Sequence, residues 1–158
     1  MNTVIFFAAK YLFLVIILLL LVFLIRLDKD SRRKAVLFSL LYLPVAFILS
    51  RIAGRLFYDP RPFVSGGFTP IISHAADNGF PSDHALLAFA LATIAFTFNK
   101  KWGIGLLLLA VLVAMGRVFS GVHSTIDVVG SAGIDILAAM IISPIFRIIW
   151  KRIKKSEA

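Results

Sequence analysis

Long runs of apolar residues, separated by short polar segments, dominate the chain. Helical membrane spans need roughly 20 such residues. Five stretches approach that length: Val4–Ile25, Ala35–Phe57, His84–Phe98, Trp102–Phe119 and Ile126–Ile149. The third is the shortest and comes near a full crossing only if it continues toward Lys100. This pattern predicts an all-α integral membrane helical bundle of about five transmembrane helices, built as a single domain over residues 1–158.

The composition supports a lipid environment. Of the 158 residues, 60% are hydrophobic. A soluble domain of this size could not cover so much apolar surface with polar groups. The chain has no cysteine, which excludes disulfides, thiolate chemistry and cysteine-ligated zinc.

The net charge of +9 is concentrated in segments on one predicted side of the bundle. Basic residues gather on the cytoplasmic side of membrane proteins, so we predict an outside N-terminus and a cytoplasmic C-terminus. The same residues can contact anionic lipid. No basic patch interleaves with exposed aromatics, so nucleic acid is not an expected partner. Twelve of the seventeen basic residues form this group: Arg26, Lys29, Arg32, Arg33, Lys34, Lys100, Lys101, Arg147, Lys151, Arg152, Lys154 and Lys155.

The opposite, outward side carries the candidate chemistry. Its long connection, Tyr58–Asp83, is rich in proline and glycine and at roughly 25 residues is long enough to suggest a function. Its short connection is Ser120–Thr125. Arginine suits phosphate because its planar fork can bind two oxygens at once. Four arginines lie in spans or at their outward ends: Arg51, Arg55, Arg61 and Arg117.

His123 and Asp127 stand four residues apart at the start of the last span. If the helix already includes His123, the carboxylate can accept the Nδ1 proton and leave Nε2 with a free lone pair. A histidine nucleophile or base requires this arrangement. The alternative is that Ser124 and Asp127 form a helix cap, and the spacing alone does not separate the two.

Other polar residues allow several interpretations. Ser82 precedes the third span, where serine normally caps free backbone N–H groups. His84 begins that span, and the neighbouring arginines favour a role for it in chemistry. His74 has no partner at a recognisable spacing and is interpreted as solvated or lipid-facing. Asp135 lies deep in the last span and is expected to face the bundle interior, paired with Arg51.

Taken in order, these segments resemble the type-2 phosphatidate phosphatase superfamily over about residues 51–130. The family pattern has a basic residue before Arg-Pro, then Pro-Ser-x-His, then an arginine followed by a spaced His and Asp. It is matched by Arg55 with Arg61-Pro62, by Pro81-Ser82-Asp83-His84, and by Arg117, His123 and Asp127.

The chain departs from this pattern in three residues and in its span count. The first basic position falls on Gly54, so Arg55 is displaced by one residue and Arg51 becomes a possible substitute. Asp83 replaces the usual glycine, and Gly116 replaces the usual serine. Members commonly have six spans, whereas five are predicted here.

The resemblance implies a phosphohistidine mechanism without a required cofactor or metal. His123 would attack phosphorus, His84 would protonate the leaving oxygen, and Asp127 would stabilise the charged ring. Arg55, Arg61, Ser82 and Arg117 would bind the phosphoryl oxygens. Three outward carboxylates could bind a divalent ion carried by a diphosphate: Asp59, Asp77 and Asp83.

Pro-Ser-Asp-His is similar to the variant in bacterial undecaprenyl-diphosphatases of the bacitracin-resistance type. This implies hydrolysis of a polyprenyl diphosphate to the monophosphate at the outer face of a bacterial cell membrane, which recycles the cell-wall carrier lipid. The alternative enzymes are phosphatidylglycerophosphate phosphatase and other lipid phosphate monoester phosphatases. The non-enzyme alternatives are a lipid-phosphate transporter and an assembly protein whose polar residues only join helices.

Overall fold

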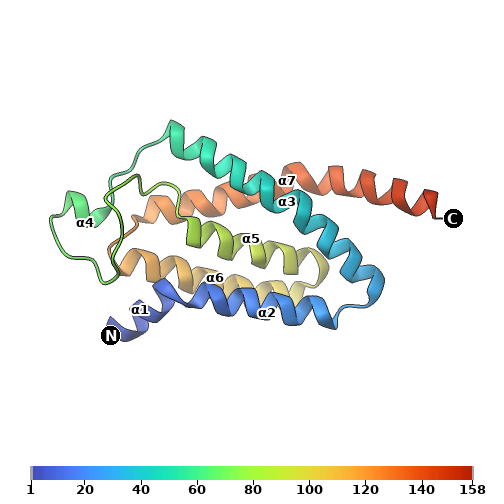
Figure 1. Ribbon diagram of the computed structural model, residues 1–158, viewed down its shortest axis with the longest axis horizontal. Helices are drawn as coiled ribbons and strands as arrows, with labels where there is room; N and C mark the ends of the chain where they lie inside the picture. Colours follow the sequence, from blue (N-terminus) through green and yellow to red (C-terminus); the bar gives the residue numbers. More distant parts are fainter. Residues whose placement is uncertain (1, 158) are drawn as a thin grey trace.

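The computed structural model describes residues 2–157, and these residues form helices joined by loops, with one isolated bridge between Pro60 and Asn78. The predicted all-α fold is thus confirmed for the described part of the chain. Figure 1 shows the long helices running alongside one another, with the C-terminus at the end remote from α4. The helices are α1 (Asn2–Lys10), α2 (Leu12–Arg26), α3 (Lys29–Leu56), α4 (Pro62–Ser65), α5 (Asp83–Phe98), α6 (Lys100–Phe119) and α7 (Thr125–Ser156).

Each predicted span coincides with helix, but the helices differ in their ability to cross a bilayer. Among the described residues, α3, α6 and α7 are long and apolar enough to do so. The bent pair α1–α2 meets the same criterion when its two parts are taken together, which gives up to four spans. Helix α5 is apolar but has only 16 residues. A fifth crossing through α5 therefore stays a prediction.

The first predicted span is not one straight helix. Helices α1 and α2 meet at Tyr11 with a bend of 51°. The bend brings α1 against α6 at Gly116, where a Cβ would lie 2.8 Å from the backbone carbon of Ala8. The absence of a side chain at Gly116 therefore permits this close approach, which a hydropathy pattern does not reveal.

Short capped turns join the helices at the end remote from the loops. The Asp28 carboxylate accepts from the backbone N–H groups of Asp30 and Ser31, each at 3.0 Å, and begins α3. The Asn99 side chain caps α6 in the same way through the N–H of Lys101 at 3.0 Å. The twelve basic residues named above lie in segments at this end of the bundle (Figure 1).

Helix α5 forms the centre of the bundle and contacts α2, α3, α6 and α7. Its buried positions are mostly alanine, which lets the neighbouring helices approach closely. Near the C-terminal end of α5, α6 packs so tightly against it that a Cβ on Gly103 would come within 2.2 Å of the Phe96 Cα. This rigid centre fixes the start of α5 relative to the ends of α3 and α6 and the start of α7.

Candidate active site at the loop end

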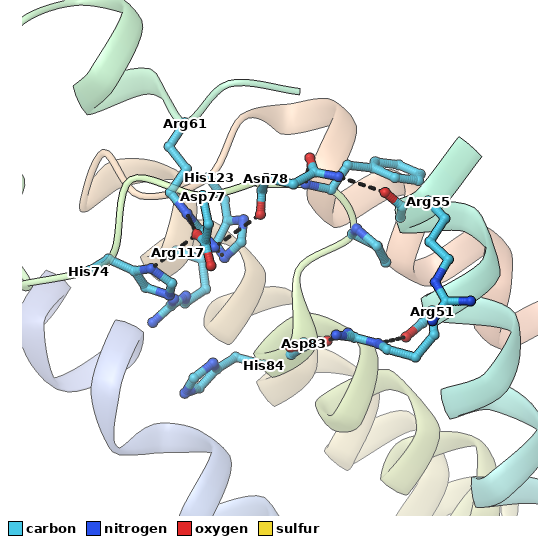
Figure 2. A pocket seen from close by; sticks show the side chains of 14 residues that line it. Arg51, Arg55, Arg61, His74, Asp77, Asn78, Asp83, His84, Arg117 and His123 are labelled. Atoms are coloured by element: carbon cyan, nitrogen blue, oxygen red, sulfur yellow. Dashed lines mark hydrogen bonds and ion pairs between the residues drawn. The ribbon is translucent and has the colours of Figure 1, made fainter. Parts of the chain in front are cut away.

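A cavity of about 420 Å³ opens where the long loop, the helix ends and the α6–α7 turn meet. Two of the seven predicted site residues, Ser82 and Asp127, are completely buried and do not line it. The other five line the cavity, as Figure 2 shows: Arg55, Arg61, His84, Arg117 and His123. The fold thus gathers these five cavity-lining residues from five separate segments.

His123 and Asp127 are in contact although α7 begins only at Thr125, so the histidine lies in the preceding turn. The Nδ1 atom of His123 is 3.1 Å from Oδ2 of Asp127. The same oxygen accepts from the Ser124 backbone N–H at 2.9 Å, and the Ser124 hydroxyl accepts from the Asp127 N–H at 3.4 Å. The helix cap and the imidazole pairing therefore coexist, and a single carboxylate oxygen serves both.

Arg61 determines which nitrogen of His123 carries the proton. Its Nη1 lies 3.2 Å from the imidazole Nε2. A guanidinium can only donate hydrogen bonds, so Nε2 accepts and the proton resides on Nδ1, facing Asp127. The Nε2 lone pair is thereby presented to the arginine side of the cavity, as a nucleophile requires.

Burial and charge keep the His123 ring neutral. The residue is 3% exposed. Burial lowers its pKa below the usual 6.5, and the nearby Arg117 and Arg61 lower it further, while the hydrogen bond to Asp127 acts in the opposite direction. At neutral pH Nε2 is therefore unprotonated.

Arg61 is held rigidly by the long loop and the α6–α7 turn. Its Nη1 donates to the Val122 carbonyl at 2.8 Å, and its Nη2 donates to the Asn78 carbonyl at 3.2 Å. Its Nε donates to Oδ1 of Asp77 at 2.7 Å. Although partial burial alone raises the pKa of Asp77, the hydrogen bond and charge of Arg61 outweigh it and leave that pKa lowered. Asp77 is thus ionised at neutral pH and faces the Arg61 guanidinium.

Asn78, which the sequence analysis missed, joins the long loop to the end of α3. Its Nδ2 donates to the carbonyls of Gly54 and Phe57 at 2.8 and 2.9 Å. Its Oδ1 accepts from the backbone N–H groups of Asp59 and Phe80 at 2.9 and 3.0 Å. All four hydrogen bonds of one amide group are therefore used to position the loop that carries the Arg61 contacts.

The Arg117 guanidinium is anchored through one of its nitrogens, and its other two have no partner among the described residues. The residue is 2% exposed, and its Nη1 donates to the Ala9 carbonyl of α1 at 3.1 Å. Its Nε and Nη2 are buried without a hydrogen-bond partner among the described residues. A buried guanidinium with free donors beside a cavity is suited to bind an anion.

Ser82 does not cap α5 as expected. It occupies the cap position, but its side chain makes no capping hydrogen bond, and its Oγ has no partner among the described residues. Its backbone instead ties it to α7: the Ser82 N–H donates to the Asp127 carbonyl at 3.3 Å, and its carbonyl accepts from the Ser131 hydroxyl at 2.9 Å. Two residues later, the His84 ring packs edge-to-face against Phe13, with centroids 4.8 Å apart.

The predicted pair of Arg51 with Asp135 is wrong. Arg51 donates from Nη2 to Oδ1 of Asp83 at the rim of the cavity. Asp135 is 4% exposed in the middle of the bundle, where it accepts from the Tyr42 hydroxyl and, at 2.7 Å, from the Thr93 hydroxyl. Local hydroxyl donors on α3 and α5 therefore satisfy this carboxylate.

His74 is not the solvated or lipid-facing residue that was expected. It lines the cavity, with its ring centroid 6.0 Å from that of His123 and its Nδ1 3.9 Å from Oδ1 of Asp77 (Figure 2). Burial lowers its pKa, and the Arg61 charge lowers it further. The contact joins two loops without a fixed sequence spacing, so no pattern could have predicted it.

The three outward carboxylates do not form a common metal site. Asp59 accepts from the Ser124 hydroxyl at 2.5 Å, while Asp77 and Asp83 are paired with different arginines. Within residues 2–157 no group of three or more histidines and carboxylates could hold a metal ion.

The sequence of the chain is similar to those of known proteins. The PAP2 superfamily model matches residues 35–154. A Bacillus licheniformis protein named bacitracin transport permease protein BcrC is 36% identical over 144 residues, which cover 90% of this chain and 70% of that protein. The undecaprenyl-diphosphatase BcrC of Bacillus subtilis (strain 168) is 32% identical over 105 residues, which cover 66% of this chain and 54% of that protein.

The fold is also similar to a solved structure. The crystal structure of Aquifex aeolicus LpxE matches with a TM-score of 0.63 and 25% identity, covering 88% of this chain and 80% of that one. The similarity in fold therefore extends over most of the chain.

Proposed function

The chain belongs to the PAP2 superfamily and is a membrane phosphatase of that family, and on this premise we propose that it hydrolyses a polyprenyl diphosphate, such as undecaprenyl diphosphate, to the monophosphate. The observation that carries the proposal is the neutral His123, oriented by Asp127 beside Arg61 and Arg117 in one cavity. The Bacillus subtilis relative, which is 32% identical over 105 residues, is named an undecaprenyl-diphosphatase.

In the proposed reaction, His123 Nε2 attacks the terminal phosphorus. A nitrogen–phosphorus bond forms as the bond to the leaving oxygen breaks. His84, protonated when the anionic substrate binds beside it, gives its proton to that oxygen. As the phosphorus approaches Nε2, a phosphoryl oxygen replaces Nε2 as the acceptor of the Arg61 Nη1 hydrogen bond, which is 3.2 Å long in this structure. Arg61, Arg117 and Arg55, which line the cavity, then bind the phosphoryl oxygens.

In the second half of the reaction, His84 removes a proton from water, and the resulting nucleophile attacks the phosphohistidine. Inorganic phosphate leaves, and the His123 ring recovers its neutral form, with its proton on Nδ1 facing Asp127. The overall change consumes one water and yields lipid monophosphate and phosphate.

The proposed location of the site is the outer face of a bacterial cell membrane. Its support is that the cavity and the twelve clustered basic residues lie at opposite ends of the bundle. Cysteines introduced at positions 2 and 156 are expected to react with impermeant reagents from the outside and the cytoplasm respectively. Labelling of both from one side would refute this topology.

No cofactor or metal is required in this scheme, because arginines and histidines supply the charge and the proton transfers. Hydrolysis is therefore expected to persist in excess EDTA. Complete loss of activity, restored by a divalent ion, would contradict the scheme.

Phosphate release by the detergent-purified protein tests the proposed function directly. A panel of polyprenyl diphosphates, phosphatidate and phosphatidylglycerophosphate should show the highest kcat/KM for a polyprenyl diphosphate. Higher kcat/KM for a monoester would replace the substrate assignment. Binding of these lipids without phosphate release would instead favour transport, as the name of the Bacillus licheniformis relative suggests.

A further inference from the structure

The cavity has two cationic walls rather than one. Arg61 and Arg117 lie on the side of the nucleophile, His123, while α3 contributes Arg51 and Arg55 on the other side (Figure 2). In the proposed reaction, the phosphoryl group at the nucleophile is bound by the first wall and by Arg55 of the second. Arg51 is not used in that reaction, so its charge is unassigned.

In the second wall, the guanidinium of Arg51 is held by contacts with neighbouring side chains. Its guanidinium lies 5.1 Å from the centre of the Phe47 ring, its Nε donates to the Ser50 hydroxyl at 3.3 Å, and its Nη2 donates to Asp83. The hydrogen bonds found among the described residues leave the donors on Nη1 for a ligand. With 45% of its side chain exposed, Arg51 remains accessible at the cavity rim.

Asp83 would repel an anionic substrate if it stood alone at the start of α5. Its pairing with Arg51 neutralises that charge and fixes the direction of the guanidinium. The pair therefore explains how a carboxylate is tolerated beside an anion site. It also gives Asp83 a positioning role, since its carboxylate holds the Arg51 guanidinium.

We propose that Arg51, oriented by Asp83, binds the lipid-linked phosphate of a diphosphate substrate and so selects diphosphates over monophosphates. The chemistry favours this assignment because the leaving group of a diphosphate keeps its negative charge, whereas a lipid monophosphate releases a neutral alcohol. A cation beyond the scissile bond thus benefits only the diphosphate. This inference rests on the proposed function and adds a residue to it.

The test compares farnesyl diphosphate with farnesyl monophosphate as substrates of the full-length protein in detergent. Arg51→Ala is expected to lower kcat/KM for the diphosphate about 10- to 100-fold, because a hydrogen-bonded charge contact is lost. The value for the monophosphate should change less than about threefold. Arg51→Lys should fall between wild type and Arg51→Ala, since it keeps the charge but loses the fork.

Two further variants separate positioning from general damage. Asp83→Asn should lower the diphosphate value by roughly 3- to 10-fold, as Arg51 loses its charged partner. Arg32→Ala, at the opposite end of the same helix, should leave both values unchanged. If Arg51→Ala does not fold, by thermal unfolding and gel filtration, Arg51→Lys decides the question.

Equal losses for both substrates, or no loss for either, would overturn the role of Arg51 while leaving the phosphatase assignment intact. A wild-type protein that hydrolyses only the monophosphate, or neither substrate, would refute the proposed function and this inference with it. Wild-type activity on each substrate therefore tells the two failures apart.

Discussion

Two buried carboxylates on α7 have opposite hydrogen-bonding states. Asp135, in the middle of the bundle, has one oxygen paired with Tyr42 and the other with Thr93. Asp127, at the start of the helix, shares its Oδ2 between His123 and Ser124, while its Oδ1 is buried without a partner among the described residues. One cluster is complete and the other is not.

This difference indicates a structural role for Asp135 and a role in the reaction for Asp127. A buried polar atom without a partner costs about 1–3 kcal/mol, so a fold retains such atoms only where something compensates. Among the described residues all of them lie at the cavity end, on Ser82, Arg117 and Asp127. The complete Asp135 cluster joins α3, α5 and α7. The incomplete Asp127 cluster lies behind His123, which lines the cavity.

The largest expected contrast concerns the two carboxylates themselves. Asp127→Asn should lower kcat by roughly 10²- to 10⁴-fold, because the His123 ring loses its charged partner and its fixed tautomer. Asp135→Asn, the matched change eight residues later, should lower kcat less than about threefold, since it lies away from the cavity. Phosphate release from a lipid diphosphate measures both, and equal losses would remove the distinction.

Replacing Arg117 tests the unpaired donors at the cavity end. Arg117→Lys should lower kcat/KM by about 10- to 100-fold, because a point charge cannot replace the two-pronged contact of the Nε and Nη2 donors. Arg32→Lys, an exposed arginine at the far end of α3, is the control and should not change it. Unaltered kcat/KM in Arg117→Lys would show that these donors do not bind the phosphoryl group.

Substitutions in the complete Asp135 cluster should change the stability of the protein rather than its activity. Tyr42→Phe keeps the ring that stacks on Phe38 but leaves one Asp135 oxygen without its donor. The free energy of unfolding should fall by about 1–3 kcal/mol, seen as a lower thermal midpoint in detergent, with kcat unchanged. Tyr58→Phe, at an exposed tyrosine, should leave the midpoint unchanged. A loss of kcat without a lower midpoint would contradict the structural assignment.

The smallest effect concerns pH. Only neutral His123 has a lone pair, so kcat/KM should fall as pH decreases through its folded-state pKa, which burial lowers below 6.5. The unfolded chain binds this proton more readily, so the stability linked to His123 is complete above about pH 6.5 and declines below it. Asp127→Asn should move the acidic limb to lower pH. An acidic limb above pH 6.5 in the wild type would contradict the assignment of His123.

The sequence predicted the helices and most of the site because both depend on local patterns. Apolar run length located the long helices, and the fixed spacing of His123 and Asp127 located their contact. Proline and glycine content identified the long loop. The cap and the imidazole pairing could not be separated in advance, since both use the same carboxylate oxygen.

The remaining features depend on contacts between distant segments. The Arg51–Asp83 pair joins α3 to α5, and His74, Asp77 and Asn78 reach the site from a loop without periodicity. The bend at Tyr11 depends on close packing of α1 against Gly116. Hydropathy and local spacing contain no information on such pairings, so only the three-dimensional arrangement reveals them.

The most direct test of the account is rapid-quench trapping of the phosphoenzyme with a substrate labelled in its terminal phosphate. The wild type and Asp135→Asn are expected to accumulate acid-labile protein-bound phosphate within a turnover. His123→Ala should accumulate none and release no phosphate, because the nitrogen that forms the covalent bond is absent. Acid-labile phosphate on His123→Ala would contradict the assignment of His123 as the nucleophile.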